Sequence, residues 1–194
     1  MKSFEEIKNI EGVQQIEKTE LYESFVFVEK GKPFLYKHFF DKQVMGEELY
    51  RYKKLKKINV YVPRLFKVFK KDLVLVYQYI SGENMAVILS KEDISEKVFE
   101  ELFTQYRFCR QWKLDINYLP ENFVFDGKTL YYTSLDLFNH DESISLDNYG
   151  IDYWFPTIKA KEHLEKLGLS IDKGRILKPA EAKKKIVLTS VLYW

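Results

Sequence analysis

Residues 34–55 read FLYKHFFDKQVMGEELYRYKKL, and the spacing of the hydrophobic residues changes inside this stretch. Aromatic and aliphatic side chains dominate residues 34–40, which is typical of a strand. From Met45 to Leu55, apolar residues recur at steps of three and four, which is the spacing of an amphipathic helix. A strand followed directly by a helix predicts an α+β fold class.

Strand signals surround this stretch in the first part of the chain. Residues 22–29 are rich in β-branched and aromatic residues, and the turn sequence Lys30-Gly31-Lys32-Pro33 joins them to residues 34–40. The spacing therefore predicts a hairpin. Two more strands are expected at residues 62–69 and 72–80, and Asn59 is expected to cap the helix before them in a left-handed conformation.

Helical signals dominate the later part of the chain. The longest helix is expected over residues 95–114, with Cys109 and Trp112 on its apolar face, and another near residues 157–167. One further hairpin is expected at residues 123–135, because its Asp126-Gly127 pair favours a tight turn.

Composition limits the possible classes of protein. The chain has 194 residues, of which 46% are hydrophobic and 31% charged, which excludes collagen, disordered tails, coiled coils and membrane bundles. A single cysteine, Cys109, excludes an internal disulfide and is expected to be a buried small hydrophobe. Residues 1–6 are charged and lack a signal-peptide core, and no apolar run reaches the roughly 18 residues of a spanning helix. We therefore expect a cytoplasmic protein with no membrane partner.

Charge is unevenly distributed, although the formal net charge is only +2. Residues 53–71 contain seven Lys and one Arg with no acidic residue, whereas residues 135–152 contain five acidic residues and no Lys or Arg. A nucleic-acid partner is not favoured by the low net charge. A nucleic-acid-binding module that uses the basic stretch is a third hypothesis, and it predicts a steep fall of affinity with salt.

The order of the expected elements resembles that of the protein-kinase superfamily, whose strand-rich N-lobe carries one helix and whose C-lobe is mainly helical. Phe34-Leu35-Tyr36-Lys37 looks like the strand that ends in the phosphate-binding lysine, and Glu48 lies on the following helix. Glu47 is the alternative to Glu48, because one helical residue turns about 100° and only one of them can face Lys37. The run from Glu48 to Pro63 is similar to that of small atypical kinases such as the RIO and aminoglycoside-kinase groups.

This resemblance implies a protein-kinase-like two-lobed fold in a single domain over residues 1–194. The strand-rich N-lobe would cover about residues 1–80, and a reduced, mainly helical C-lobe about residues 84–194.

Residues 73–83 resemble the fifth kinase strand and the hinge that follows it. On that resemblance Tyr77 is the gatekeeper residue. The backbone groups of Gln78, Tyr79 and Ile80 would then contact the adenine of ATP.

Residues 114–125 look like the catalytic loop, whose family form is H-R-D-x-x-x-x-N, and Pro120-Glu121-Asn122 matches its usual ending. Asp136 follows the second hairpin, where the family has D-F-G. The resemblance makes Asn122 and Asp136 the ligands of Mg²⁺, and both offer the hard oxygen atoms that this ion prefers.

The catalytic base has two candidates. Family spacing places it five residues before Asn122, at Asn117, but a neutral amide cannot accept a proton as a carboxylate does. Asp115, seven residues before Asn122, would serve if Tyr118 and Leu119 form a two-residue insertion, and it is the candidate that we favour.

The resemblance implies an ATP- and Mg²⁺-dependent phosphotransferase that acts on a hydroxyl group of a protein (Ser/Thr) or of a small molecule. Three departures weaken that expectation. Residues 17–22 contain no glycine where the family has its phosphate loop, Leu137-Phe138 stands where the family has Phe-Gly, and few residues remain for a C-lobe. The alternative is a pseudokinase that acts as a binding or regulatory module without phosphoryl transfer.

Overall fold

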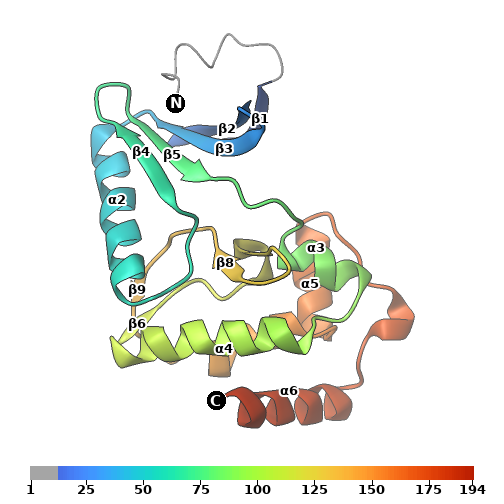
Figure 1. Ribbon diagram of the computed structural model, residues 1–194. Coiled ribbons are helices and arrows are strands. Elements are labelled where there is room, and N and C mark those ends of the chain that lie inside the picture. Colours follow the sequence, from blue (N-terminus) through green and yellow to red (C-terminus); the bar gives the residue numbers. More distant parts are fainter. Residues whose placement is uncertain (1–12) are drawn as a thin grey trace. The chain divides into compact units, whose positions relative to one another are not determined.

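The computed structural model describes residues 13–194, and its helices and strands confirm the α+β class (Figure 1). The described residues form two compact units: one holds residues 13–53 together with Pro63–Ile80, and the other holds Lys54–Val62 and Ser81–Trp194. Among the described residues, every helix is too short or too polar to cross a lipid bilayer. Residues 1–6, which we expect not to form a signal peptide, lie outside the described residues.

The first unit is built on a five-stranded antiparallel sheet with the order β1-β2-β3-β5-β4. The predicted hairpin at Lys30-Gly31 is confirmed, and both of its turn residues have positive φ angles, 51° and 75°. The strands are β1 (Gln14–Lys18), β2 (Tyr22–Glu29), β3 (Lys32–Phe39), β4 (Leu65–Phe69) and β5 (Val74–Gln78).

The sheet has two different faces, because neighbouring residues of a strand point to opposite sides. Lys37 pairs with Leu75 and Leu35 with Tyr77, so these four residues share one face. Tyr36 and its partner Val76 lie on the other face, in a hydrophobic cluster with Phe27, Val74 and their neighbours. The alternation therefore separates this apolar cluster from the face that carries Lys37, on which Leu75 and Tyr77 are buried too.

The helix of the first unit is α2 (Lys42–Lys57). The carboxylate of Asp41 accepts hydrogen bonds from the backbone N–H groups of Gln43 and Val44 at 2.6 and 3.2 Å, which satisfies donors at the start of the helix. The chain turns after the helix at Asn59, whose φ is 63°. The predicted left-handed cap is therefore confirmed.

The second unit is mainly helical and contains two small antiparallel strand pairs, β6 with β9 and β7 with β8. The hairpin predicted at residues 123–135 is confirmed as the pair β7–β8, and the predicted helix near residues 157–167 is confirmed as α5. The elements are α3 (Met85–Lys91), α4 (Glu96–Gln111), β6 (Leu114–Asp115), η1 (Pro120–Asn122), β7 (Phe123–Phe125), β8 (Leu130–Tyr132), β9 (Phe138–Asn139), η2 (Leu146–Gly150), η3 (Ile151–Trp154), α5 (Ile158–Lys166), η4 (Lys173–Arg175) and α6 (Pro179–Tyr193).

The end of α4 differs from the prediction. The helix stops at Gln111 instead of residue 114, and Lys113 turns the chain with a φ of 52°. Trp112 therefore leaves the apolar face: it is 50% exposed, and the Lys57 ammonium lies 5.1 Å from the centre of its ring. The prediction that Trp112 lies on the apolar face of the helix was wrong, whereas Cys109 is fully buried as expected.

Candidate functional site

Lys37 and Glu48 form an ion pair within the first unit. The ammonium of Lys37, near the end of β3, lies 2.5 Å from Oε2 of Glu48 on α2. Glu48 is only 3% exposed, so this carboxylate has lost most of its hydration and depends on its partners. Glu47, the alternative considered from the sequence, is exposed and accepts a hydrogen bond from Gln43 instead. The structure therefore brings Lys37 together with Glu48.

The second oxygen of Glu48 accepts a hydrogen bond from the hydroxyl of Tyr77 at 2.9 Å. Burial, together with the neighbouring charge of Glu48, raises the pKa of Tyr77 well above its usual range, so this hydroxyl stays protonated and donates. Tyr52 packs against the Tyr77 ring, and its own hydroxyl accepts a hydrogen bond from the backbone N–H of Leu65. The gatekeeper candidate thus fixes the orientation of Glu48.

The side chain of Tyr22 covers Lys37 from another direction. The ammonium lies 3.8 Å from the centre of the Tyr22 ring, which is a close cation–π contact. Tyr22 begins β2 and donates a hydrogen bond to Glu17 on β1 at 2.8 Å. The hydroxyl of Thr19 accepts the backbone N–H of Tyr22 and closes the turn between these strands. The turn that lacks the phosphate-loop glycines is therefore short and internally bonded.

The predicted adenine-contacting residues end β5 and follow it. The backbone N–H of Gln78 donates to the carbonyl of Arg64 at 2.8 Å. Tyr79 is half-buried, and Ile80 is buried. These positions remain predictions, because nothing in their contacts identifies an adenine.

In the second unit, Asp115 is fully buried and its carboxylate is occupied. Oδ2 accepts hydrogen bonds from Nδ1 of His140 at 2.6 Å and from the backbone N–H of Asp141 at 3.0 Å. Oδ1 accepts one from the hydroxyl of Tyr118 at 3.3 Å. The pairing of β6 with β9 sets this inward orientation, since it places Asp115 opposite Phe138 and close to His140.

His140 lies between Asp115 and Arg110. A guanidinium nitrogen of Arg110 lies against Nε2 of the ring. Nδ1 of the same ring faces the carboxylate of Asp115. Asp115, His140 and Arg110 thus form a continuous row of polar contacts that occupies the Asp115 carboxylate.

Asn117, the other base candidate, belongs to a different cluster. Its backbone N–H donates to the hydroxyl of Tyr132 at 3.1 Å, and that hydroxyl donates to the carbonyl of Asp136 at 3.0 Å. The side chain of Asn122 donates to the carbonyl of Asn117 at 3.4 Å. Asn117, Asn122 and Asp136 therefore gather around Tyr132, whereas the side chain of Asp115 is bonded elsewhere.

The hairpin β7–β8 holds this cluster together. The carbonyl of Asn122 accepts hydrogen bonds from the backbone N–H and the hydroxyl of Thr133, at 2.8 and 3.0 Å. At the other end of the hairpin, the carboxylate of Asp126 caps the turn and Gly127 has a φ of 93°. The Asp-Gly turn thus brings the chain around Asn122 next to the chain that leads to Asp136.

The cluster offers few but suitable oxygen atoms for a magnesium ion. Asp136 accepts a hydrogen bond from the hydroxyl of Ser134 on one carboxylate oxygen. Within residues 13–194, its other oxygen and the side-chain oxygen of Asn122 accept none. Mg²⁺ keeps several waters and takes one or two carboxylates, which this pair fits. Residues 13–194 contain no group of three or more His, Cys, Asp or Glu side chains able to hold a metal ion.

Sequence reasoning missed three residues that organise these clusters. Tyr22 could have been found from the alternation of β2 and β3, since its partner Phe39 is two residues from Lys37 and on the same face. Tyr132 lies in the predicted hairpin, but no sequence pattern marks it as the residue whose hydroxyl joins Asn117 to Asp136. His140 could not be connected with Asp115, because the pairing of β6 with β9 is not visible in the sequence.

No protein-family model matches this chain, and no curated protein matches it either.

Proposed function

We propose that this chain is a kinase-like protein that binds ATP together with Mg²⁺. The observation that carries the proposal is the buried ion pair between Lys37 on a strand and Glu48 on the helix that follows it. In protein kinases, a strand lysine held by a helix glutamate positions the phosphates of ATP. The pair supports the same use here, because Glu48 is held in turn by Tyr77.

The other candidate residues take roles that their chemistry allows. Asn122 and Asp136 would hold Mg²⁺ through the oxygens that accept no protein hydrogen bond. When bound, the ion would neutralise phosphate charge. Tyr77 would border the adenine, and the backbone groups of Gln78, Tyr79 and Ile80 would contact it.

We place the pseudokinase function ahead of the phosphotransferase function. Phosphoryl transfer to a hydroxyl needs a carboxylate that orients the hydroxyl and accepts its proton. The candidate that lies in the cluster with Asn122 and Asp136 is Asn117, whose side chain is a neutral amide. The carboxylate of Asp115 is buried and hydrogen-bonded to His140. The proposed function is therefore a nucleotide-dependent binding or regulatory module in a two-lobed kinase-like fold.

The second candidate is the ATP-dependent phosphotransferase, acting on a hydroxyl of a protein or a small molecule. The Lys37–Glu48 pair is compatible with it, because both candidates would use this pair to hold the phosphates of ATP. In this case Asp115 would act as the base and would have to leave His140.

ATP binding tests the proposal. We expect calorimetry to show ATP binding that weakens when Mg²⁺ is chelated. Lys37→Met should weaken binding at least tenfold, whereas Lys32→Met, on an exposed residue of the same strand, should change it less than twofold. Asp136→Ala should remove most of the dependence on Mg²⁺. Absence of binding at millimolar ATP, or equal binding by Lys37→Met, would refute the proposal.

The rate at which ADP is formed from ATP separates the two candidates. If the protein is a pseudokinase, the wild type should form ADP no faster than Asp136→Ala. Asn117→Asp, which puts a carboxylate into the cluster, should raise the rate, and Asn117→Ser should not. Turnover by the wild type that is lost in a folded Asp115→Asn variant would instead establish the phosphotransferase.

A further inference from the structure

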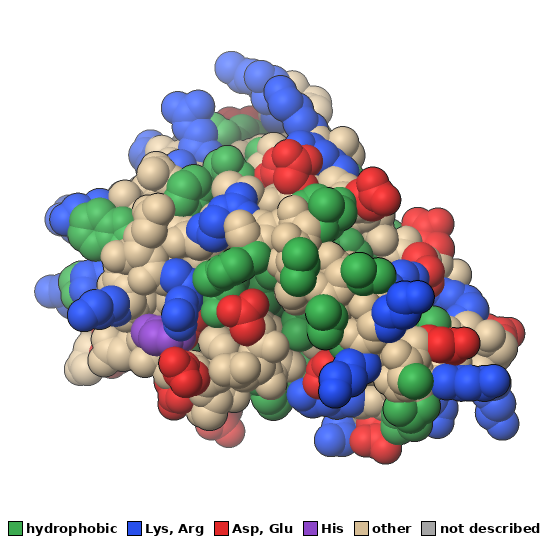
Figure 2. All heavy atoms as spheres, turned by 90° about the horizontal axis from the view of Figure 1, so that it is seen from below, with side chains coloured by type: hydrophobic (Ala, Val, Ile, Leu, Met, Phe, Trp, Pro, Cys, Tyr) green, Lys and Arg blue, Asp and Glu red, His purple; other side chains and the backbone are tan. Residues whose placement is uncertain are grey.

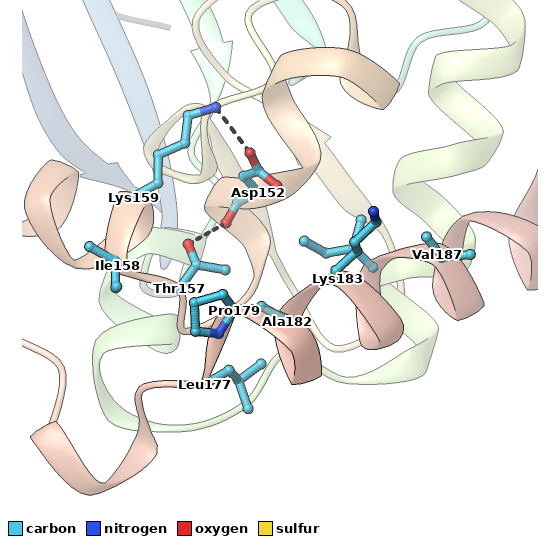
Figure 3. A pocket seen from close by; sticks show the side chains of 10 residues that line it. Asp152, Thr157, Ile158, Lys159, Leu177, Pro179, Ala182, Lys183 and Val187 are labelled. Carbon is cyan, nitrogen blue, oxygen red and sulfur yellow. Dashed lines mark hydrogen bonds and ion pairs between the residues drawn. The ribbon is translucent and has the colours of Figure 1, made fainter.

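A groove of about 310 Å³ lies beside α6 in the second unit (Figure 3). This volume is near the lower end of the roughly 300–1,000 Å³ of ligand pockets, so it has room for a few side chains and not for a large cofactor. Its apolar lining comes from the start of α5 and the first half of α6, with the segment before it: Ile158, Leu177, Pro179, Ala182, Ile186 and Val187.

The two edges of the groove differ in charge. On the α5 side, Lys159 is paired with Asp152 at 3.2 Å, so the two charges largely cancel (Figure 3). On the α6 side, Lys183 lines the groove and makes no ion pair with any residue from 13 to 194. The groove thus offers an apolar floor with an uncompensated cation at one edge.

The surrounding segment is basic. Residues 157–194 contain nine Lys and Arg against four Asp and Glu, a formal charge of +5. Asp152 and Asp93, which lie outside the segment, pair with Lys159, Arg175 and Lys185 and reduce this excess to +3. The whole chain has a formal charge of only +2, so the other residues together carry −3. A partner that binds here gains from negative charge.

Hydrophobic side chains also gather on the face that Figure 2 shows, over α6, with both basic and acidic side chains around them. On α6, Leu188 is 58% exposed, and Val191 and Leu192 are more exposed still. These three residues do not line the groove. A second copy of the chain would bring together two segments that are both net positive, and a flat membrane surface would not fill a groove. Both features favour a protruding acidic segment.

We infer that this groove binds an acidic peptide segment of a partner protein. One or two bulky aliphatic side chains of the segment occupy the apolar floor, and carboxylates next to them pair with Lys183. This interaction does not depend on the nucleotide.

Fluorescence anisotropy of the full chain tests the inference. The probe is a fluorescein-labelled dodecapeptide in which Leu recurs at every third or fourth position among Glu residues. We expect a Kd below roughly 100 μM, as for a small transient interface, and a several-fold loss of affinity between 50 and 300 mM NaCl. Control peptides with Ser in place of Leu, or Lys in place of Glu, should bind at least tenfold more weakly.

Two matched pairs of variants locate the site. Val187→Glu and Lys183→Glu change residues that line the groove and should each weaken binding at least fivefold. Leu188→Glu and Lys184→Glu change exposed neighbours that do not line it and should alter binding less than twofold. Thermal melts confirm that each variant is folded, and all four residues are exposed, so folding should be preserved.

Four outcomes would overturn the inference. The first is no probe binding at 1 mM protein. The second is an equal loss of affinity in Val187→Glu and Leu188→Glu, or in Lys183→Glu and Lys184→Glu, which indicates unspecific attraction. The third is dimerisation in sedimentation that Leu188→Glu abolishes, which assigns the apolar face of α6 to a second copy. The fourth is sedimentation with phosphatidylserine vesicles without binding to the probe, which assigns it to a lipid surface.

Discussion

Glu48→Ala should strongly destabilise the first unit, because one carboxylate serves two buried partners. The substitution leaves the ammonium of Lys37, 14% exposed in its side chain, without its counter-charge. It also leaves the buried hydroxyl of Tyr77 without an acceptor. Removing one member of a buried ion pair costs about 3–5 kcal/mol. The cation–π contact of Lys37 with Tyr22 is present before and after the substitution, so it does not offset this loss.

The expected loss is therefore about 3–5 kcal/mol, a large share of the roughly 5–15 kcal/mol by which domains are stable. Glu47→Ala is the matched control and should change stability by less than about 0.5 kcal/mol, because Glu47 is exposed on the same helix. The triple variant Lys37→Met, Glu48→Leu and Tyr77→Phe removes every polar partner together. It should lie within about 1 kcal/mol of the wild type, since apolar replacements of buried pairs are often neutral or stabilising.

Urea unfolding followed by far-UV circular dichroism measures these differences. Tryptophan fluorescence alone would not report them, because Trp112, Trp154 and Trp194 all belong to the second unit. A Glu48→Ala variant within 1 kcal/mol of the wild type would show that the carboxylate is not held as described. A triple variant as unstable as Glu48→Ala would show that the loss comes from packing rather than from unpaired polar groups.

Three further substitutions or measurements test other parts of the structure. Tyr36→Phe should leave stability unchanged or raise it by up to about 1 kcal/mol in urea unfolding, because the buried Tyr36 hydroxyl has no hydrogen-bond partner among residues 13–194. A loss above 1 kcal/mol would reveal a partner. Gly150→Ala should cost about 1–3 kcal/mol, because a Cβ there would lie 2.7 Å from that of Tyr118, and unchanged stability would contradict this close approach. Burial raises the pKa of the Cys109 thiol to about 12, so the native thiol should not react with Ellman's reagent at pH 8. The unfolded thiol has a pKa near 9, so the stability due to the buried thiol is complete below that pH and is lost as the pH rises towards 12. Fast labelling of the native protein would contradict this. So would equal free energies of unfolding for the wild type and Cys109→Ala at every pH from 8 to 11.

Local patterns were sufficient for most of the first unit. The alternation around Lys37 and the helical spacing after Met45 placed β3 and α2, and with them the ion pair, because both partners lie on consecutive elements. β1 was not predicted, since its residues QQIEK are exposed and mostly polar. The pairing of β1 with β2, rather than its own composition, makes it a strand.

Two helices of the second unit were missed for different reasons. α3 is only seven residues long and follows a stretch that reads as a turn, although Asn84 caps it by accepting the N–H of Val87. α6 is apolar on nearly every side along its last two turns and so has no stripe to recognise. What the helix contacts, rather than its own pattern, decides which of its sides is buried.

The contacts that bear on the choice between Asp115 and Asn117 as the base are distant in the sequence. From spacing alone, Asp115 is the favoured base if Tyr118 and Leu119 form an insertion, and this stays a prediction. In the structure, β9 pairs with β6 from more than twenty residues further along and brings His140 to the carboxylate. A strand of two residues carries no pattern that announces such a pairing.

The energy needed to free Asp115 bears on the proposed function. To act as a base, its carboxylate would have to leave His140 and the backbone N–H of Asp141, at 2.6 and 3.0 Å. Hydrogen bonds to a charged group contribute about 1.5–3 kcal/mol each, so release costs about 3–6 kcal/mol. At 1.4 kcal/mol per factor of ten, the free carboxylate would be present in about one molecule in a hundred to one in ten thousand. Transfer through Asp115 would be slowed by that factor, whereas ATP binding at Lys37 would be unaffected, and this asymmetry is why we place nucleotide-dependent binding ahead of catalysis.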